Sequence, residues 1–309
     1  MVKLHFGGFF MNKEAFKRSF RIIKRKKWPI VLAVLIVIAV ISAPIVSNAV
    51  ALHKRYTAKS PIALSSIYVK KTDQNKINLI AHRGFSCQAP ENTIAAIKKA
   101  AEYGFDTVEI DIRQTADSVW VVSHDSDIKG MTDKSGKISS YTYYDLITAD
   151  IDNGANHKNY SGLKIATLDQ MLQACLANNV KPMIEIKDYT DEGLDTLLQI
   201  IDKNGFTESC SVISFDRNAL NKVRERNGKI ELYALVSKLD KDTLKQCLDD
   251  PTIGVSFNGH QRINNEKKIK QLRDAGIPLA CWTVDDKEIM RKYYEMGITT
   301  FVTNRIYKK

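Results

Sequence analysis

Short apolar runs rich in β-branched residues alternate with longer amphipathic stretches from residue 78 to the end of the chain. A run of roughly four to eight such residues is typical of a buried strand, whereas apolar residues spaced three and four apart predict a helix. Strands are predicted at residues 78–82, 106–112, 180–187, 210–215, 230–236, 252–257, 278–284 and 299–304. Helices are predicted at residues 92–104, 167–179, 193–205, 217–228, 241–250, 265–276 and 287–297. One further short extended piece is predicted at residues 118–124.

This alternation predicts the fold class. Eight strands with helices between them, over residues 77–309, are typical of an α/β domain folded as a (β/α)8 TIM barrel. The alternative is an open, doubly wound sheet, but no glycine-rich phosphate loop follows the first strand. In a barrel the functional residues gather at the C-terminal ends of the strands, so the polar residues at those ends become the first candidates for a site.

A long uncharged segment precedes the predicted barrel. No charged residue occurs from Trp28 to Leu52, and these 25 residues would span about 37 Å as a helix, enough to cross a bilayer. We therefore predict a basic cytoplasmic segment at residues 1–27, one N-terminal transmembrane helix at residues 28–50 and a juxtamembrane linker at residues 51–76.

The charges beside this segment predict its orientation. The cluster Lys-Arg-Lys-Lys at residues 24–27 is expected to stay in the cytoplasm, so that a single pass through the cell membrane places the barrel outside. Cleavage near Ala49-Val50-Ala51, which resembles a signal-peptide site and would release a secreted protein, is the alternative.

The basic excess of the chain is confined to the segments that flank the apolar run. The chain has 46 Lys and Arg against 35 Asp and Glu, a net charge of +11. Residues 1–27 carry a net charge of +8 and residues 53–76 carry +5, which leaves −2 for the predicted barrel. A nearly neutral domain does not neutralise several phosphates at once, so no nucleic-acid partner is predicted.

The five cysteines have no metal-binding spacing and are expected to be small buried hydrophobic residues.

Ionisable residues recur where the predicted strands end. They are His82 and Arg83 after the first strand, Glu109 and Asp111 in the second, His124 after the extended piece, and Glu185 and Lys187 in the third. Taken singly, each is more simply explained as a structural or solvated residue. Together, three carboxylates, two imidazoles and two cations match a divalent cation with oxygen ligands, acid/base groups and phosphate-binding side chains.

Several motifs in this order resemble those of the glycerophosphodiester phosphodiesterase family. HRG-FSCQA-PENT at residues 82–93 is followed by VEIDIRQTADSVWVVSHD at residues 108–125 and by IEIK at residues 184–187. The similarity runs from about Ile80 to Thr303 and excludes the predicted membrane segment. The resemblance implies metal-dependent hydrolysis of glycerophosphodiesters to sn-glycerol 3-phosphate and an alcohol, with a cyclic phosphate intermediate.

The resemblance also implies a role for each matching position. The implied general acid and base are His82 and His124, in an order that the sequence does not decide. The implied ligands of Ca²⁺ or Mg²⁺ are Glu109, Asp111 and Glu185. The implied substrate-binding residues are Arg83 and Lys187 for the phosphate and Trp282 for the glycerol or the leaving alcohol.

Other positions in the motifs are expected to be structural. Asn92 and Thr93 are expected to cap the first helix, and Gly84 to allow a close approach of the backbone. Two positions depart from the family pattern, since Ser118 stands where the family usually has Gly and Asn304 where it tends to have Asp. The second departure is expected to affect the loop after the eighth strand and not the chemistry.

The substrate and two further functions stay open at this point. Deacylated phospholipids and glycerol-phosphate polymers of an envelope both suit a membrane-anchored enzyme. A phospholipase D-like lyase that acts on intact lipids is one alternative, although the Pro-Glu-Asn-Thr and Glu-Ile-Lys motifs favour the hydrolase. A catalytically inactive barrel that binds ligands at the cell surface is the other.

Overall fold

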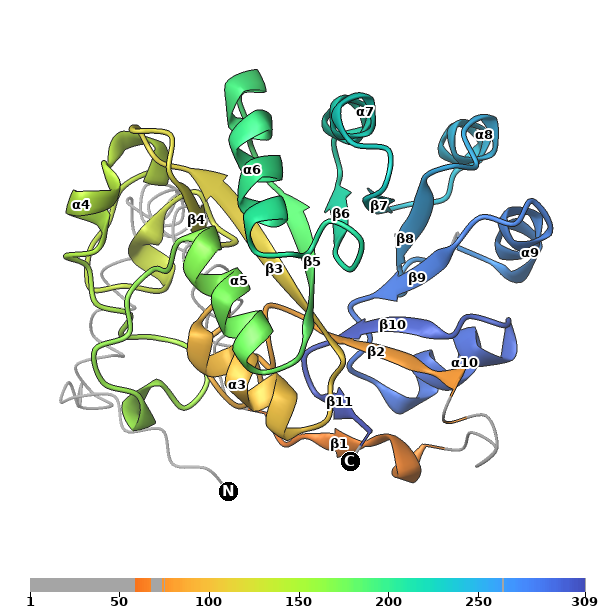
Figure 1. Ribbon diagram of the computed structural model, residues 1–309. Helices are drawn as coiled ribbons and strands as arrows, with labels where there is room; N and C mark the ends of the chain where they lie inside the picture. The colour runs from red at the N-terminus through yellow and green to blue at the C-terminus, as the bar shows by residue number, and fades with distance from the viewer. Residues whose placement is uncertain (1–58, 68–73, 75, 263, 309) are drawn as a thin grey trace, which may run out of the picture. The chain divides into compact units, whose positions relative to one another are not determined.

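The computed structural model describes residues 59–67, 74, 76–262 and 264–308, and these form a closed barrel of parallel strands (Figure 1). The eight barrel strands are β2 (Asn78–Ala81), β3 (Thr107–Gln114), β5 (Lys181–Ile186), β6 (Ser211–Ser214), β7 (Glu231–Val236), β8 (Gly254–Asn258), β9 (Leu279–Trp282) and β10 (Thr300–Thr303). Each strand pairs with the next along the chain, and β10 pairs with β2 to close the ring. The prediction of a (β/α)8 barrel is confirmed, and the alternative prediction of an open doubly wound sheet is wrong.

In the part of the chain that the structure describes, seven amphipathic helices surround the strands, as the apolar periodicity predicts. They are α3 (Ile94–Glu102), α5 (Leu168–Ala177), α6 (Asp191–Lys203), α7 (Arg217–Arg226), α8 (Lys241–Asp249), α9 (Glu266–Asp274) and α10 (Lys287–Glu295). The side chain that caps each N-terminus is a Thr, Asp or Asn, namely Thr93, Thr167, Thr190, Asp216, Asp240, Asn265 and Asp286. Such caps satisfy backbone N–H groups that have no partner within the helix, which is why the helices begin where they do.

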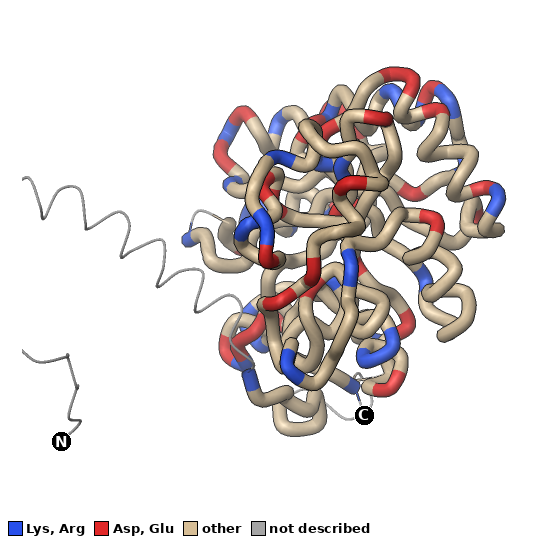
Figure 2. Tube along the Cα trace, turned by 90° about the vertical axis from the view of Figure 1, so that its left-hand side faces the viewer, with Lys and Arg blue, Asp and Glu red and all other residues tan. Residues whose placement is uncertain are grey.

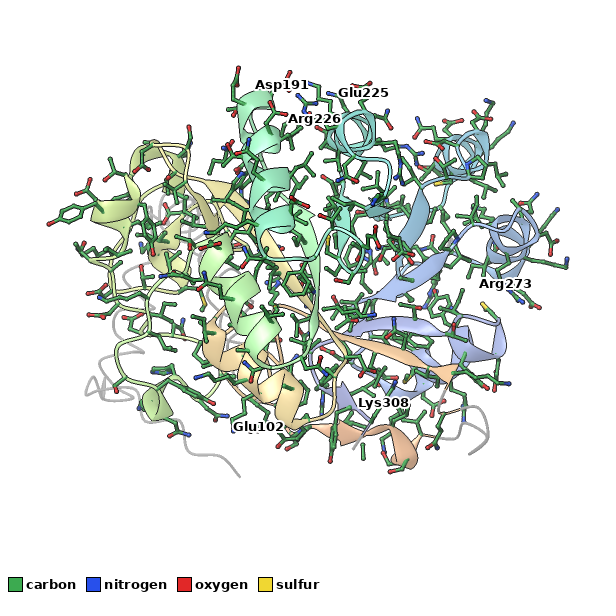
Figure 3. All side chains as sticks on the ribbon, in the orientation of Figure 1. Glu102, Asp191, Glu225, Arg226, Arg273 and Lys308 are labelled. Carbon is green, nitrogen blue, oxygen red and sulfur yellow. The ribbon has the colours of Figure 1, made fainter. Side chains whose placement is uncertain are left out.

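The apolar residues form two main layers. Strand residues alternate between them: in β7, Leu232, Ala234 and Val236 pack outward against the helices, whereas Tyr233 and Leu235 point into the barrel. The outward faces of the helices carry the charged side chains, such as the labelled Asp191 and Arg226 (Figure 3). Blue and red segments are interspersed along the tube (Figure 2), in line with the nearly neutral domain that the sequence predicts.

A small subdomain follows the second barrel strand. The extended piece predicted after that strand is β4 (Trp120–Val122), which pairs antiparallel with β3. It leads into the short elements η3 (Ile128–Gly130), η4 (Ile138–Ser140), α4 (Tyr143–Leu146) and η5 (His157–Asn159). These elements enclose an apolar cluster of their own, which includes Val121, Ile138 and Leu146.

The segment before residue 77 differs from the expected linker. Strand β1 (Ile62–Ala63) pairs with β11 (Ile306–Tyr307), and the turn η1 (Leu64–Ser66) follows it. Leu64 and Ile67 are buried in the outer apolar layer, so at least residues 62–67 belong to the folded unit. Residues 62–67 fold onto the barrel because burial of the apolar side chains of Leu64 and Ile67 is favourable, although the surrounding sequence is polar.

The predicted cytoplasmic segment and transmembrane helix, residues 1–27 and 28–50, lie outside the described residues. Within the described ranges, every helix is too short or too polar to cross a membrane.

Candidate active site

A cavity of about 90 Å³ opens toward the C-terminal ends of the barrel strands. Its polar side is lined by His82, Arg83, Glu109, His124, Glu185 and Lys187. Its opposite side is formed by strands β6 to β10 and by residues that follow them. The lining residues there are Ile213, Phe215, Leu235, Ser256, Trp282, Thr283 and Val302. Asp111 is fully buried beside the polar side, in contact with Arg83 and Lys187. All eight residues that the sequence singled out are therefore brought together.

Three carboxylates form the base of the polar side. One oxygen each of Glu109, Asp111 and Glu185 lies within 4.8 Å of the others, and Asp111 and Glu185 are directly opposite each other on β3 and β5. Burial raises the pKa of Glu109, and the charges of Asp111 and Glu185 raise it further. Burial likewise raises the pKa of Glu185 to about 7, with Asp111 adding to the effect. Three buried carboxylates so close together repel one another unless cations offset their charge.

Two basic side chains partly offset this charge. Lys187 Nζ lies 2.9 Å from Asp111 Oδ1 and 2.5 Å from Glu185 Oε1. Arg83 Nη1 donates to Glu91 Oε1 at 2.9 Å, and Arg83 Nε lies 3.3 Å from Asp111 Oδ2. Burial acts to raise the pKa of Asp111, but the charges of Arg83 and Lys187 outweigh it and hold that pKa well below its usual range. Asp111 is therefore ionised.

The carboxylate cluster fits a hard divalent cation. Glu109 Oε1 is buried and has no hydrogen-bond partner within the described residues, so this oxygen can take a ligand. The cluster offers carboxylate oxygens and neither thiol nor imidazole. Such a donor set suits Ca²⁺ or Mg²⁺ better than Zn²⁺, which prefers nitrogen and sulfur ligands.

His82 is oriented by the end of the last barrel strand. Its Nδ1 lies 2.8 Å from Asn304 Oδ1, while Asn304 Nδ2 donates to Asp285 Oδ2 at 2.6 Å. Because the amide nitrogen is taken by Asp285, the amide oxygen faces the imidazole and Nδ1 carries the ring proton. Nε2 is then an acceptor, 3.9 Å from Glu109 Oε2.

The imidazole of His82 is neutral near pH 7. Burial lowers its pKa to about 4, and the charge of Arg83 acts in the same direction. Its contact with Glu109 is therefore not an ion pair at neutral pH. Asn304, a departure from the family pattern in the loop after the eighth strand, therefore also contacts His82.

His124 lines the same cavity from the segment that follows β4. Arg113 fixes its backbone, because Nε and Nη2 donate to the His124 carbonyl at 3.1 and 2.8 Å. Nδ1 of His124 lies 2.7 Å from Asp125 Oδ1. Burial lowers the pKa of His124, while the hydrogen bond to Asp125 acts in the opposite direction. The two imidazoles thus have different partners, an amide for His82 and a carboxylate for His124.

The loop after β2 holds the carboxylates in place. Gly84 has φ +74°, and a Cβ there would come within 2.6 Å of Ala96 in α3, so the expected close approach is confirmed. Thr93 caps α3, since its Oγ1 accepts from Ala96 N at 3.1 Å. Asn92 does not cap the helix as expected: its Nδ2 donates to Asp111 Oδ2 at 2.8 Å, and its Oδ1 accepts from Asp111 N at 3.2 Å. The reason is that Asn92 adopts a left-handed φ of 57°, which turns its side chain toward β3.

The opposite side of the cavity is mostly apolar. Trp282 Nε1 donates to Ser256 O at 2.9 Å, and the Trp282 indole packs edge-on against Phe215 with ring centroids 5.6 Å apart. Phe215 is 51% exposed, an unusual exposure for a large apolar side chain. The sequence patterns did not single out Phe215 or Ser256, and they predicted that Asn304 affects only the loop after the eighth strand. Phe215 and Asn304 are the last residues of their predicted strands. The expectation that functional residues lie at strand ends therefore points to both.

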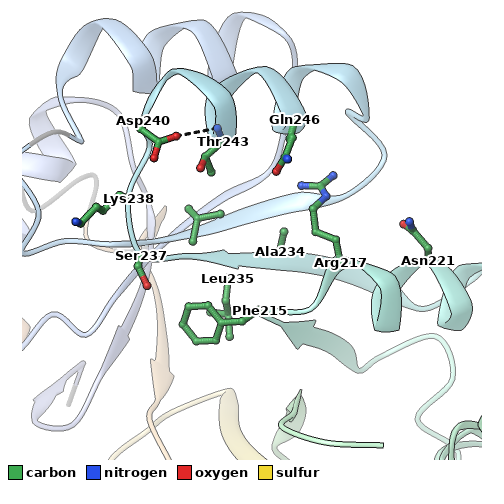
Figure 4. A pocket seen from close by; sticks show the side chains of 11 residues that line it. Phe215, Arg217, Asn221, Ala234, Leu235, Ser237, Lys238, Asp240, Thr243 and Gln246 are labelled. Atoms are coloured by element: carbon green, nitrogen blue, oxygen red, sulfur yellow. Dashed lines mark hydrogen bonds between the residues drawn. The ribbon is translucent and has the colours of Figure 1, made fainter. Parts of the chain in front are cut away.

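A second, wider cavity of about 710 Å³ lies between α7 and α8 (Figure 4). It is lined by Arg217 at the start of α7 and by Lys238 in the loop after β7. Phe215 and Leu235 line both cavities. The two cavities are therefore neighbours, with Phe215 and Leu235 in the wall of each.

Comparisons with known proteins agree with this geometry. A model of the glycerophosphoryl diester phosphodiesterase family matches residues 82–308. The chain is 32% identical over 166 residues to mouse glycerophosphodiester phosphodiesterase 1, a match that covers 51% of this chain and 48% of the mouse protein. It is 27% identical over 245 residues to a glycerophosphodiester phosphodiesterase of Caldanaerobacter subterraneus, covering 74% of this chain and 94% of that one. The match to the mammalian proteins thus spans about half of their length.

Solved structures share the barrel. A phosphodiesterase from Oleispira antarctica, in complex with the product sn-glycerol-3-phosphate, superposes with a TM-score of 0.68 at 23% identity. That match covers 74% of this chain and 92% of the Oleispira chain. A glycerophosphodiester phosphodiesterase from Thermotoga maritima superposes with a TM-score of 0.60 at 26% identity, covering 74% of this chain and 94% of that one.

Proposed function

Because the chain belongs to the glycerophosphoryl diester phosphodiesterase family, we propose that its barrel hydrolyses glycerophosphodiesters to sn-glycerol 3-phosphate and an alcohol. One observation carries the proposal: a buried cluster of three carboxylates shares its cavity with two cations and two imidazoles that have different partners. This is the set of groups that attack on an anionic phosphodiester requires, since both the negative charge and two proton transfers must be managed.

Charge on the phosphodiester is offset from the polar side of the cavity. Glu109, Asp111 and Glu185 would hold a divalent cation, Ca²⁺ or Mg²⁺, which when bound supplies positive charge to a phosphate oxygen. Arg83 and Lys187 bind the phosphate as further cations, and Arg83 presents its donors in a planar fork suited to phosphate oxygens. Glu91 and Asp111 hold the guanidinium in place.

His82 is the general base in the first step. Its Nε2 is the free acceptor of a neutral imidazole, so it takes the proton of the glycerol 2-hydroxyl as that oxygen attacks phosphorus. His124 gives its proton to the departing alcohol, and its hydrogen bond to Asp125 acts against the lowering of the ring's pKa by burial. One P–O bond forms and one breaks, which leaves a cyclic glycerol phosphate.

The second step reverses the proton transfers. His124 is now neutral and removes a proton from water, whose oxygen attacks phosphorus. His82 is now protonated and returns its proton to the 2-oxygen as the ring opens. Both imidazoles thereby regain their starting states, and sn-glycerol 3-phosphate is released.

Deacylated phospholipids and glycerol-phosphate polymers are the proposed substrates, since an enzyme attached to the cell membrane would meet both at the envelope. The attachment rests on the uncharged segment at residues 28–50, which would anchor the chain with its barrel outside the cell membrane. Carbonate extraction of isolated membranes tests the attachment, and protease digestion of intact cells, done separately, tests the orientation. A chain recovered in the soluble fraction, or protected on the inner side, contradicts the proposal.

The activity is tested on the full-length protein in detergent. Glycerophosphocholine, glycerophosphoethanolamine, glycerophosphoglycerol and a glycerol-phosphate polymer are each supplied with Ca²⁺, Mg²⁺ or Mn²⁺, and released glycerol 3-phosphate is measured. We expect release from at least one substrate. An intact lysolipid is supplied as well, and a lysolipid cyclic phosphate as its end product would instead identify a lyase. No turnover under any condition would identify an inactive binding barrel.

A further inference from the structure

One buried hydroxyl in the cavity has no partner within the described residues. Ser256 is 0% exposed, and its Oγ makes no hydrogen bond to any described group. Leaving a buried hydroxyl unpaired destabilises a folded protein, and nearly all buried polar atoms are paired. Ser256 also lines the cavity that contains the catalytic groups. An unpaired hydroxyl at such a position calls for a hydrogen-bonding partner that enters the cavity.

The strand pattern explains where this hydroxyl lies. Ser256 is in β8, directly between Leu235 of β7 and Ala280 of β9. Its neighbours Val255 and Phe257 belong to the outer apolar layer, so alternation turns Ser256 into the barrel. There the side chains of the adjacent strands are apolar.

The backbone of Ser256 is held as well. Its carbonyl accepts the hydrogen bond from Trp282 Nε1 at 2.9 Å, which ties the indole to β8, and both residues line the cavity. The apolar side of the cavity therefore combines a flat aromatic surface with one buried, unpaired hydroxyl. Carbon atoms of a small polyol fit the indole, and one of its hydroxyl groups fits Ser256.

We propose that Ser256 Oγ binds the terminal hydroxyl of the glycerol moiety and selects glycerol esters over esters that lack this group. The inference rests on the proposed function and deepens it. With the phosphate on Arg83 and Lys187 and the 2-hydroxyl on His82, the terminal hydroxyl is the remaining polar group of glycerol. Directing it to the apolar side pairs the buried Ser256 hydroxyl, which has no hydrogen-bond partner within the described residues.

The test compares two substrates that differ in that hydroxyl alone. Glycerophosphocholine has it, whereas 2-hydroxypropyl phosphocholine keeps the nucleophilic 2-hydroxyl and has a methyl group in its place. In the wild-type protein we expect kcat/KM to favour glycerophosphocholine by about tenfold or more, the effect of one hydrogen bond to a buried group. In Ser256→Ala this ratio should fall close to 1, mainly through loss on glycerophosphocholine. A ratio that Ser256→Ala leaves unchanged overturns the proposal.

A second serine provides the matched control. Ser214 in β6 is also buried, but its Oγ donates to Ile186 O at 2.9 Å and it does not line the cavity. Ser214→Ala should lower the thermal transition and leave the substrate ratio at its wild-type value. Ser256→Ala removes a hydroxyl without a partner, so it should not lower the transition. Equal losses on both substrates with a lowered transition would make Ser256 a structural residue.

A binding measurement separates this proposal from the proposed function. Isothermal titration calorimetry with Ca²⁺ present compares sn-glycerol 3-phosphate with 2-hydroxypropyl phosphate on the wild-type protein and on Ser256→Ala. A preference for glycerol 3-phosphate that disappears in the variant supports the role of Ser256 even if no diester is hydrolysed. Absence of any preference in the wild-type protein overturns it, whatever the activity assays give.

Discussion

The side chain of Asn304, near the C-terminal end of the sequence, holds the ring of His82, with Oδ1 of Asn304 and Nδ1 of His82 2.8 Å apart. The two residues are 222 positions apart in the sequence and become neighbours because β10 pairs with β2. Asp285 holds the amide in turn, so the proton on the His82 ring is placed by a chain of two side chains.

Asn304→Ala should therefore slow turnover through His82 without disturbing substrate binding. Without the acceptor, the ring can turn and can carry its proton on Nε2, where it no longer acts as a base. We expect kcat to fall about tenfold or more and KM to change little. Steady-state kinetics check this. Substitution by Asp, which keeps an acceptor at the same place, should restore most of kcat; a rise in KM alone would argue against a positioning role.

His82→Ala and His124→Ala should each reduce kcat by about a hundred-fold to ten-thousand-fold, the usual contribution of a positioned acid or base. Neither ring is part of an apolar cluster, so the thermal transition should stay near its wild-type value. His157→Ala, outside the cavity, is the control and should retain full activity. Substantial turnover by either cavity variant would refute the assigned roles.

Removal of divalent cations should lower stability as well as activity. A cation held by Glu109, Asp111 and Glu185 would offset their mutual repulsion, and a ligand at about one hundred times its Kd adds about 2.7 kcal/mol to the free energy of unfolding. We expect Ca²⁺ or Mg²⁺ to raise the thermal transition of protein treated with EDTA. Glu109→Gln should reduce this increase, whereas Glu225→Gln, on the exposed face of α7 (Figure 3), should not. An identical cation titration for Glu109→Gln would count against ligation by this residue.

The five cysteines should be unreactive in the folded protein. All five are buried and free, as the sequence predicts for small hydrophobic residues. Burial raises the pKa of Cys175 and of Cys210 to about 12, so both are protonated thiols at pH 8, and the thiolate is the reactive form. Titration with Ellman's reagent at pH 8 should detect almost no thiol before unfolding and five in denaturant. Rapid reaction of a thiol in the native protein would contradict this.

Ser118→Gly should stabilise the protein. Ser118 is exposed and has φ 62°, in the left-handed region that glycine adopts without strain. Relief of the strain exceeds the extra chain entropy of glycine, so we expect a gain of about 0.5 kcal/mol in the free energy of unfolding. Urea denaturation measures it. Ser118→Val, which adds a branched side chain at the same φ, should lower stability, and the reverse order of the two variants would disprove the explanation.

The sequence by itself determined the elements of the barrel and the identity of its ionisable residues. Apolar periodicity is a local property, so the strand at residues 180–187 and the helix at residues 193–205 could be predicted from their own residues. The order of strands and helices then placed His82, Glu109 and Glu185 at one end of the barrel. The family motifs added their roles.

Only the tertiary structure decided which side chains meet. Asn92 turns to Asp111 instead of capping its helix, Asn304 reaches His82, and Ser256 faces the cavity without a partner. Each of these relationships depends on the register between strands that are far apart in sequence, and on the backbone angles at a single residue. Local periodicity carries no information on either, because it reports which face of an element is buried and not what lies across from it.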